Sequence, residues 1–159
     1  MVKIEQLKTD LLKARDYFNS VLDQVDDRWE TQVYPDGPAW TVRQVLIHVA
    51  DAARGHNNQA MGIAEGREVI PPDFDLERYN RRSIEKRAEK TVEEARTDLI
   101  AARTALLEWL DTIDESVLAR RGRHATMEIL SVGEIIQRLI SHELEHAEDI
   151  RRALGLKME

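Results

Sequence analysis

Two histidines near the C-terminus stand four residues apart, in the sequence His-Glu-Leu-Glu-His at residues 142–146. In a helix, residues at this spacing share one face, so His142 and His146 can offer imidazole nitrogens to a single metal ion. The pattern also matches the HExxH motif of zinc metalloproteases, in which the intervening glutamate, here Glu143, is the general base. The motif therefore raises two possibilities, a zinc protease and another kind of metal site.

The residues after His146 argue against a protease. In the common HExxH enzymes the third ligand is a histidine six residues further on, or a glutamate well downstream on another helix. Position 152 is Arg152, Asp149 stands where the extended motif has glycine, and only residues 147–159 follow. We therefore expect the third ligand upstream of this motif.

Helical periodicity covers most of the chain and predicts four long amphipathic helices. They are expected at residues 4–25, at 41–64, from 91 with an apolar stripe reaching 113, and at 131–154; a short extra piece is expected at 76–86. Three of the starts carry a capping box, formed by Thr41 with Gln44, Thr91 with Glu94, and Ser131 with Glu134. Gly155 is the expected stop of the last helix.

These helices predict an all-α fold, an antiparallel four-helix bundle that forms a single domain over residues 1–159. Long loops follow the first and second helices, and each contains two prolines that exclude helix: Pro35 and Pro38, then Pro71 and Pro72. Such loops are where a pocket mouth is expected.

The candidate third ligand is His48, in the second helix. At about 100° per residue, His142 and His146 lie roughly 20° on either side of the direction of the apolar Ile135, and His48 lies at the edge of its own buried face. One histidine on a half-buried face is more often a hydrogen-bonded core residue than a ligand. Three imidazoles converging from two helices are better explained by a divalent metal ion.

The other polar residues near this motif have simpler explanations. Glu143 points to the buried side of its helix, where it is either a general base or one half of an ion pair with an arginine. His56 is expected to pack in the core or line a cleft, and His124, in an arginine-rich connector, is expected to be exposed. On the predicted helix at 131–154, the solvent-exposed face is expected to carry Glu145, Glu148 and Asp149.

Composition limits the classes of partner. The net charge of -7 and the lack of a long basic stripe argue against nucleic acid. The chain has no cysteine, which excludes disulfides, thiolate metal ligands and a cysteine nucleophile. No apolar run reaches the length of a membrane span, and the N-terminus lacks a signal-peptide pattern. We therefore expect a soluble cytoplasmic protein that acts on a small molecule.

Three segments resemble the DinB-like (DinB/YfiT) four-helix-bundle family. Trp40-Thr41 followed by Leu46 and His48 is similar to the signature of its second helix, and residues 142–150 are similar to that of its fourth. Residues 74–80, with Phe-Asp-Leu and Tyr-Asn, resemble the segment before its third helix. The order and spacing of the three motifs extend the resemblance over nearly the whole chain.

The resemblance implies a divalent metal held by His48, His142 and His146, with open positions for water or substrate. We expect Zn²⁺ or Ni²⁺, with Fe²⁺ or Mn²⁺ as alternatives. Characterised relatives include transferases and isomerases that depend on a low-molecular-weight thiol, and homodimers are common, so a homodimer is expected.

Two functions stay open at this point. One is a metal-dependent enzyme, a thiol-dependent transferase or a hydrolase that acts on a small electrophilic molecule. The other is a non-catalytic bundle that binds a small molecule or dimerises, with histidines that serve packing alone.

Overall fold

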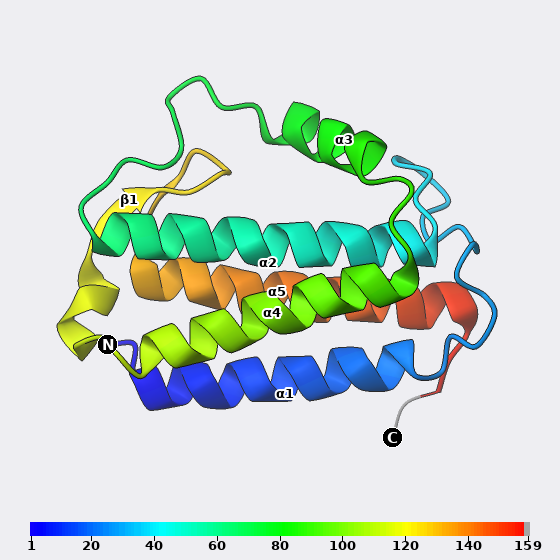
Figure 1. Cartoon of the computed structure of the whole chain (residues 1–159), viewed down its shortest axis with the longest axis horizontal. Helices are drawn as coiled ribbons and strands as arrows, with labels where there is room; N and C mark the ends of the chain where they lie inside the picture. Colours follow the sequence, from blue (N-terminus) through cyan, green and yellow to red (C-terminus); the bar gives the residue numbers. More distant parts are fainter. Residues whose placement is uncertain (158–159) are drawn as a thin grey trace.

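The computed structural model describes residues 1–157, which form five α-helices, one short 3₁₀ helix and a two-stranded antiparallel sheet. The elements are α1 (Ile4–Leu22), α2 (Val42–Ala64), α3 (Leu76–Lys86), α4 (Val92–Leu110), η1 (Glu115–Ala119), β1 (Arg121–Arg123), β2 (Ile129–Ser131) and α5 (Val132–Leu154). The long helices α1, α2, α4 and α5 make a four-helix bundle, which confirms the predicted fold (Figure 1).

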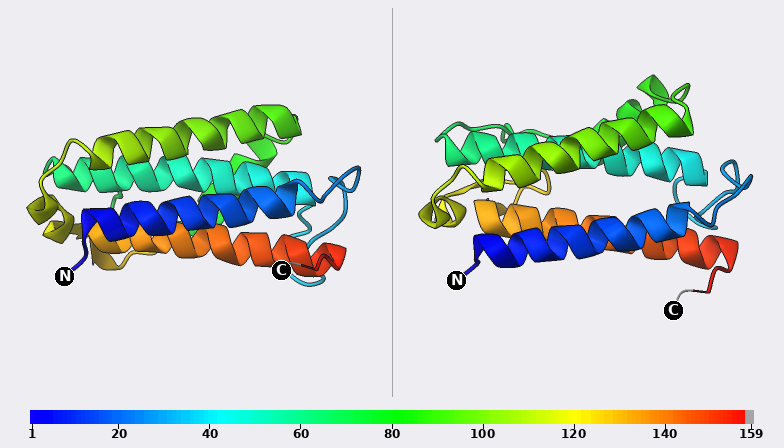
Figure 2. Two further views of the ribbon diagram at one scale, coloured as in Figure 1. Left: turned by 90° about the horizontal axis from the view of Figure 1, so that it is seen from below. Right: turned by 60° about the horizontal axis from the view of Figure 1, so that its bottom comes forward.

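The bundle has two helices in each direction. Helices α1 and α5 run parallel to each other, and α2 and α4 run parallel to each other in the opposite sense (Figure 1). The two pairs form two layers (Figure 2), which meet mainly where α2 packs antiparallel against α5. Residues 65–91 cross back along the bundle and carry α3 over α2, and this long crossing makes α2 and α4 parallel.

The predicted capping boxes fix three helix starts. The side chains of Thr41, Thr91 and Ser131 each accept a hydrogen bond from the backbone N–H three residues on. In return, the backbone N–H of each donates to the side-chain oxygen of that later residue. Gly155 ends α5 in a left-handed conformation with φ 63°, as predicted. Helix α2 ends at Ala64, as predicted. Helix α1 ends earlier than expected, at Leu22, before Asp26 adopts a left-handed conformation with φ 58°, and α4 ends at Leu110, short of residue 113.

The connector between α4 and α5 contains a β-hairpin that the sequence did not predict. Strands β1 and β2 pair Arg121 with Ser131 and Arg123 with Ile129. The N–H of His124 donates to the carbonyl of Glu128 (2.8 Å) and closes the turn. Strands of three residues are too short for an apolar alternation, so no periodic signal marks them.

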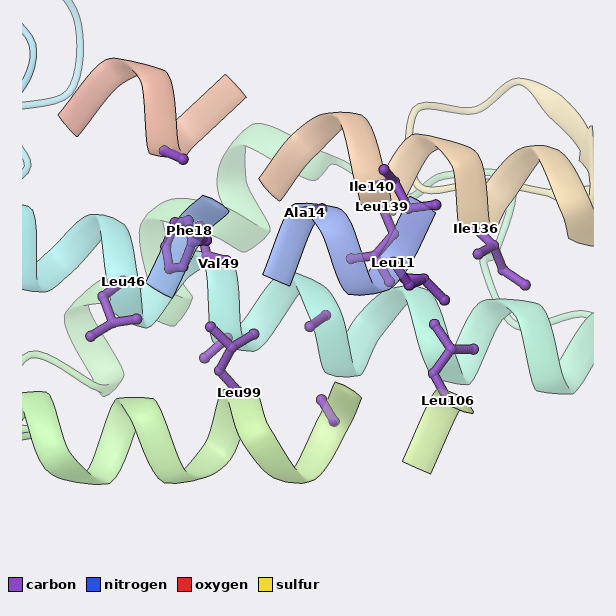
Figure 3. Packing of buried hydrophobic residues seen from close by; sticks show 14 of the residues in the cluster. Leu11, Ala14, Phe18, Leu46, Val49, Leu99, Leu106, Ile136, Leu139 and Ile140 are labelled. Carbon is purple, nitrogen blue, oxygen red and sulfur yellow. The ribbon is translucent and has the colours of Figure 1, made fainter. Parts of the chain in front are cut away.

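The core lies between the two layers. Apolar side chains from all four long helices fill it, among them Phe18 of α1, Leu46 of α2 and Leu99 of α4 (Figure 3). Each of these three side chains is at least 99% buried. Within residues 1–157, no helix combines the length and apolar character needed to cross a membrane.

Candidate metal centre

The three predicted histidines meet inside the bundle, between α2 and α5. His142 and His146 lie one turn apart on α5, and the capping box at Ser131 sets the start of that helix and hence the face they share. His48 lies on the facing helix α2, whose start is set in the same way at Thr41. Because α2 packs against α5, the imidazole of His48 lies next to those of His142 and His146.

The Nε2 atoms of the three rings converge. Nε2 of His142 lies 3.0 Å from Nε2 of His48 and 3.1 Å from Nε2 of His146. One ligand atom from each residue lies within 4.8 Å of the other two. Nitrogens bound to one zinc ion at about 2.0–2.1 Å are roughly 3.3–3.4 Å apart in a tetrahedral site. The two separations that involve His142 are therefore close to those between ligands of a single ion.

Burial keeps these imidazoles neutral. Burial first, and then the neighbouring imidazoles, lower the pKa of His48 to about 3 and that of His142 to about 2. Burial also lowers the pKa of His146, against the opposing effect of Asp149. A neutral imidazole has a nitrogen lone pair, which is the form that binds a metal ion.

Tyr34 and Asp149 orient the His146 ring. The Tyr34 hydroxyl donates to Oδ2 of Asp149 (2.8 Å), so its oxygen accepts from Nδ1–H of His146, also at 2.8 Å. With the proton on Nδ1, the Nε2 lone pair of His146 points to the centre of the triad. Asp149 and Glu148 are both half-buried, so the prediction of solvated residues was wrong for these two; Glu145 is exposed as predicted. The half-buried Glu148 accepts a hydrogen bond from the Tyr17 hydroxyl (2.8 Å).

The loop between α1 and α2 closes this end of the site. Its residues 33–40 fold back, because the N–H of Val33 donates to the carbonyl of Trp40 (2.9 Å), and this places the Tyr34 and Trp40 rings 6.4 Å apart. The Trp40 ring in turn lies 4.8 Å from that of His48. Sequence reasoning did not identify Tyr34, because a loop residue has no periodicity that would orient it.

Glu143 has a different environment from the triad. Its carboxylate forms an ion pair with Arg103 of α4, and both side chains are buried. Together they line a small space near α1 and α4, on another side of α5. The sequence left open a general base and an ion pair with an arginine; the structure shows the ion pair, in which the Glu143 carboxylate faces Arg103 and not the triad.

The other two histidines form a pair of their own. Nε2 of His124 lies 3.0 Å from Nε2 of His56. Nδ1 of His124 accepts from the N–H of Thr126 (3.1 Å), so its Nε2 carries the proton and donates to His56. Nδ1–H of His56 donates to the carbonyl of Ala52 (2.8 Å). Both rings are therefore hydrogen-bonded through both nitrogens, and neither joins the triad.

The prediction that His124 is exposed was wrong. His124 is 3% exposed, because the unpredicted hairpin packs over α2 and places the His124 ring against that of His56. His124 is buried only by the long-range contact between the hairpin and α2. Its neighbours in the sequence therefore could not indicate that it is buried. His56 lines a cleft, which is one of the two roles expected for it.

A cavity of about 310 Å³ opens beside the triad. His48 and His142 form one side of it, and the His56–His124 pair forms another. The crossing segment 65–91 and the hairpin supply further wall residues. A small molecule in this cavity would lie next to the converging nitrogens.

Comparison with known proteins agrees with this architecture. The sequence model of the DinB superfamily matches residues 10–150. YfiT from Bacillus subtilis, described as a probable metal-dependent hydrolase with an unusual four-helix bundle topology, is 18% identical, with a TM-score of 0.74 over 99% of this chain and 92% of that one. No match is found among curated proteins.

Two further structures share the fold. An uncharacterized protein from Clostridium difficile 630 is 13% identical with a TM-score of 0.78, and 99% of each chain is covered. The sibling lethal factor precursor DfsB is 14% identical with a TM-score of 0.70 over 98% of this chain and 96% of that one. The match of the sequence model to most of the chain, together with the bundle and its histidines, shows that this protein belongs to the DinB superfamily.

Proposed function

We propose that this protein is a metal-dependent enzyme whose divalent ion is held by Nε2 of His48, His142 and His146. The observation that carries the proposal is the convergence of these atoms, with Nε2 of His142 3.0 and 3.1 Å from the other two. Three protein ligands leave a coordination position for water or substrate, whereas a structural zinc ion has four protein ligands. The three-histidine set therefore supports a catalytic centre.

The residues around the triad fit this role. A bound divalent ion would supply Lewis acidity and lower the pKa of a water molecule or thiol. The Tyr34–Asp149 pair holds His146 in the tautomer that offers Nε2 to the triad. The neighbouring cavity can hold a small electrophilic molecule beside the centre.

We propose hydrolysis of a small electrophile as the reaction. The likeness to YfiT, described as a probable metal-dependent hydrolase, supports this choice. Transfer of a low-molecular-weight thiol to the same kind of electrophile is the alternative, because a thiol would use the same open position. Product analysis with and without added thiol separates the two: hydrolysis proceeds without it, and transfer leaves the thiol sulfur in the product.

Metal analysis of protein purified without chelator tests the proposal. We expect about one divalent ion per chain in the wild type, as for a single three-ligand site. His48→Ala removes one of the three nitrogens and is expected to lose most of the metal. His56→Ala is the matched control, a histidine of the same helix outside the triad, and is expected to keep it. Equal metal content in wild type and His48→Ala would refute the three-histidine site.

Tyr34→Phe tests the orientation of His146. The change removes the hydroxyl whose oxygen accepts from Nδ1–H of His146 and whose O–H donates to Asp149. We expect the affinity for Zn²⁺ to fall about 10-fold, the lower end of the effect of losing such a partner. Competition with a chromogenic chelator measures it, and Tyr17→Phe, which removes a hydroxyl bonded to Glu148, is the control. An unchanged affinity in Tyr34→Phe would show that the hydroxyl is not needed to orient the ring, leaving packing and Asp149, whose Oδ2 lies 3.4 Å from Nδ1 of His146, to do so.

A further inference from the structure

The cavity beside the triad has an apolar wall. The crossing segment between α2 and α4 runs over α2 (Figure 1) and turns apolar side chains toward the cavity, while the exposed residues Asn58, Ser141 and Glu145 belong to its rim. The Phe74 and Tyr79 rings lie 5.6 Å apart at an angle of 45°. The apolar wall consists of Val69, Ile70, Phe74, Leu76 and the ring of Tyr79, a residue that is 41% exposed.

The buried polar side chains that line the cavity outside the triad already have partners. The His56–His124 pair uses all of its ring nitrogens. The side-chain oxygen of Gln59 accepts from the N–H of Ala125 (3.1 Å), and the buried carboxylate of Asp51 is paired with Arg54 and accepts from the Ser83 hydroxyl. A strongly polar ligand would give up its hydrogen bonds to water and find few replacements here. An apolar group pays no such penalty and removes apolar wall surface from water.

We infer that the substrate is a small molecule with an aromatic ring, which rests against Phe74 and Tyr79 while its reacting polar group faces the triad. This inference rests on the proposed metal centre. Aromatic side chains favour a ring as occupant, because tilted and edge-to-face pairs of rings are stabilising. The volume of about 310 Å³ lies at the small end of the range for ligand sites, so the substrate is small.

Two hydroxamates test the inference on zinc-loaded protein by isothermal titration calorimetry. Acetohydroxamate and benzohydroxamate carry the same zinc-binding group. Benzohydroxamate has a phenyl ring where acetohydroxamate has a methyl group. We expect benzohydroxamate to bind about 10- to 100-fold more tightly, because its ring is buried against the apolar wall. Equal affinities, or tighter binding of acetohydroxamate, would overturn the aromatic substrate while leaving the metal centre intact.

Substitutions in the apolar wall test where the phenyl ring of benzohydroxamate binds. Phe74→Ala and, separately, Tyr79→Ala are expected to weaken benzohydroxamate about 5- to 10-fold and to leave acetohydroxamate within about twofold. Binding of acetohydroxamate also shows that each variant is folded. Ile100→Ala, which truncates an apolar residue of α4 that is 58% exposed, is the control and is expected to change neither affinity. A preference that survives in both wall variants would place the ring elsewhere and overturn the inference. Protein that takes up no zinc and binds neither hydroxamate would refute the proposed function itself.

Discussion

Glu143→Ala is expected to lower the free energy of unfolding by about 3–5 kcal/mol, the usual cost of removing one partner of a buried ion pair. The Glu143 side chain is 4% exposed and that of Arg103 is 9% exposed. The guanidinium lies against the Phe18 ring, with its carbon 5.7 Å from the ring centroid. Without the carboxylate, this charge stays buried beside an apolar ring with little to compensate it. Urea denaturation, with the slope of the transition compared between variants, measures the loss.

A double variant separates the ion pair from the space it fills. Arg103→Met with Glu143→Leu replaces both charges by apolar side chains of similar length and is expected to recover most of the stability. Glu143→Gln, which keeps the shape, is expected to retain full metal content, since the carboxylate faces Arg103 rather than the triad. A loss below about 1 kcal/mol in Glu143→Ala would contradict the buried pair as the main role of this residue.

Removal of the metal is expected to destabilise the wild-type protein by about 4 kcal/mol relative to protein with free metal at 1,000 times the dissociation constant. The reason is mass action: the folded chain brings the three nitrogens together, and the unfolded chain does not. For a chain of this length, the loss corresponds to a decrease of roughly 8–16 °C in melting temperature. Thermal unfolding with Zn²⁺ and with chelator measures the difference.

His142→Ala is expected to abolish this difference, because it removes the nitrogen that lies 3.0 and 3.1 Å from the other two. The comparison is between the two conditions for one variant, so any direct cost of the substitution cancels. Leu144→Ala, at a 39% exposed position of the same helix, is expected to keep the full difference. Identical unfolding of the wild type with metal and with chelator would exclude a bound ion that stabilises the fold.

The positions of the helices and of the paired histidines follow from local sequence. Each capping box is formed by residues three apart, and the shared face of His142 and His146 by residues four apart, so neither depends on the rest of the fold. The capping boxes and the paired histidines were predictable because the interactions behind them span no more than a turn of helix. His48 was predicted differently, since no suitable ligand follows His146 and His48 lies at the edge of a buried helix face.

Only the tertiary structure decided what surrounds the triad. Tyr34 reaches His146 from a loop, and Asp149 is half-buried because of that contact, although helical periodicity places it on a solvated face. The hairpin buries His124 against His56, and α4 supplies the arginine that Glu143 faces. Each of these contacts joins residues that lie far apart in the sequence or on different elements. Periodicity and capping orient a side chain on its own helix, but the partner it meets depends on how the elements pack against one another.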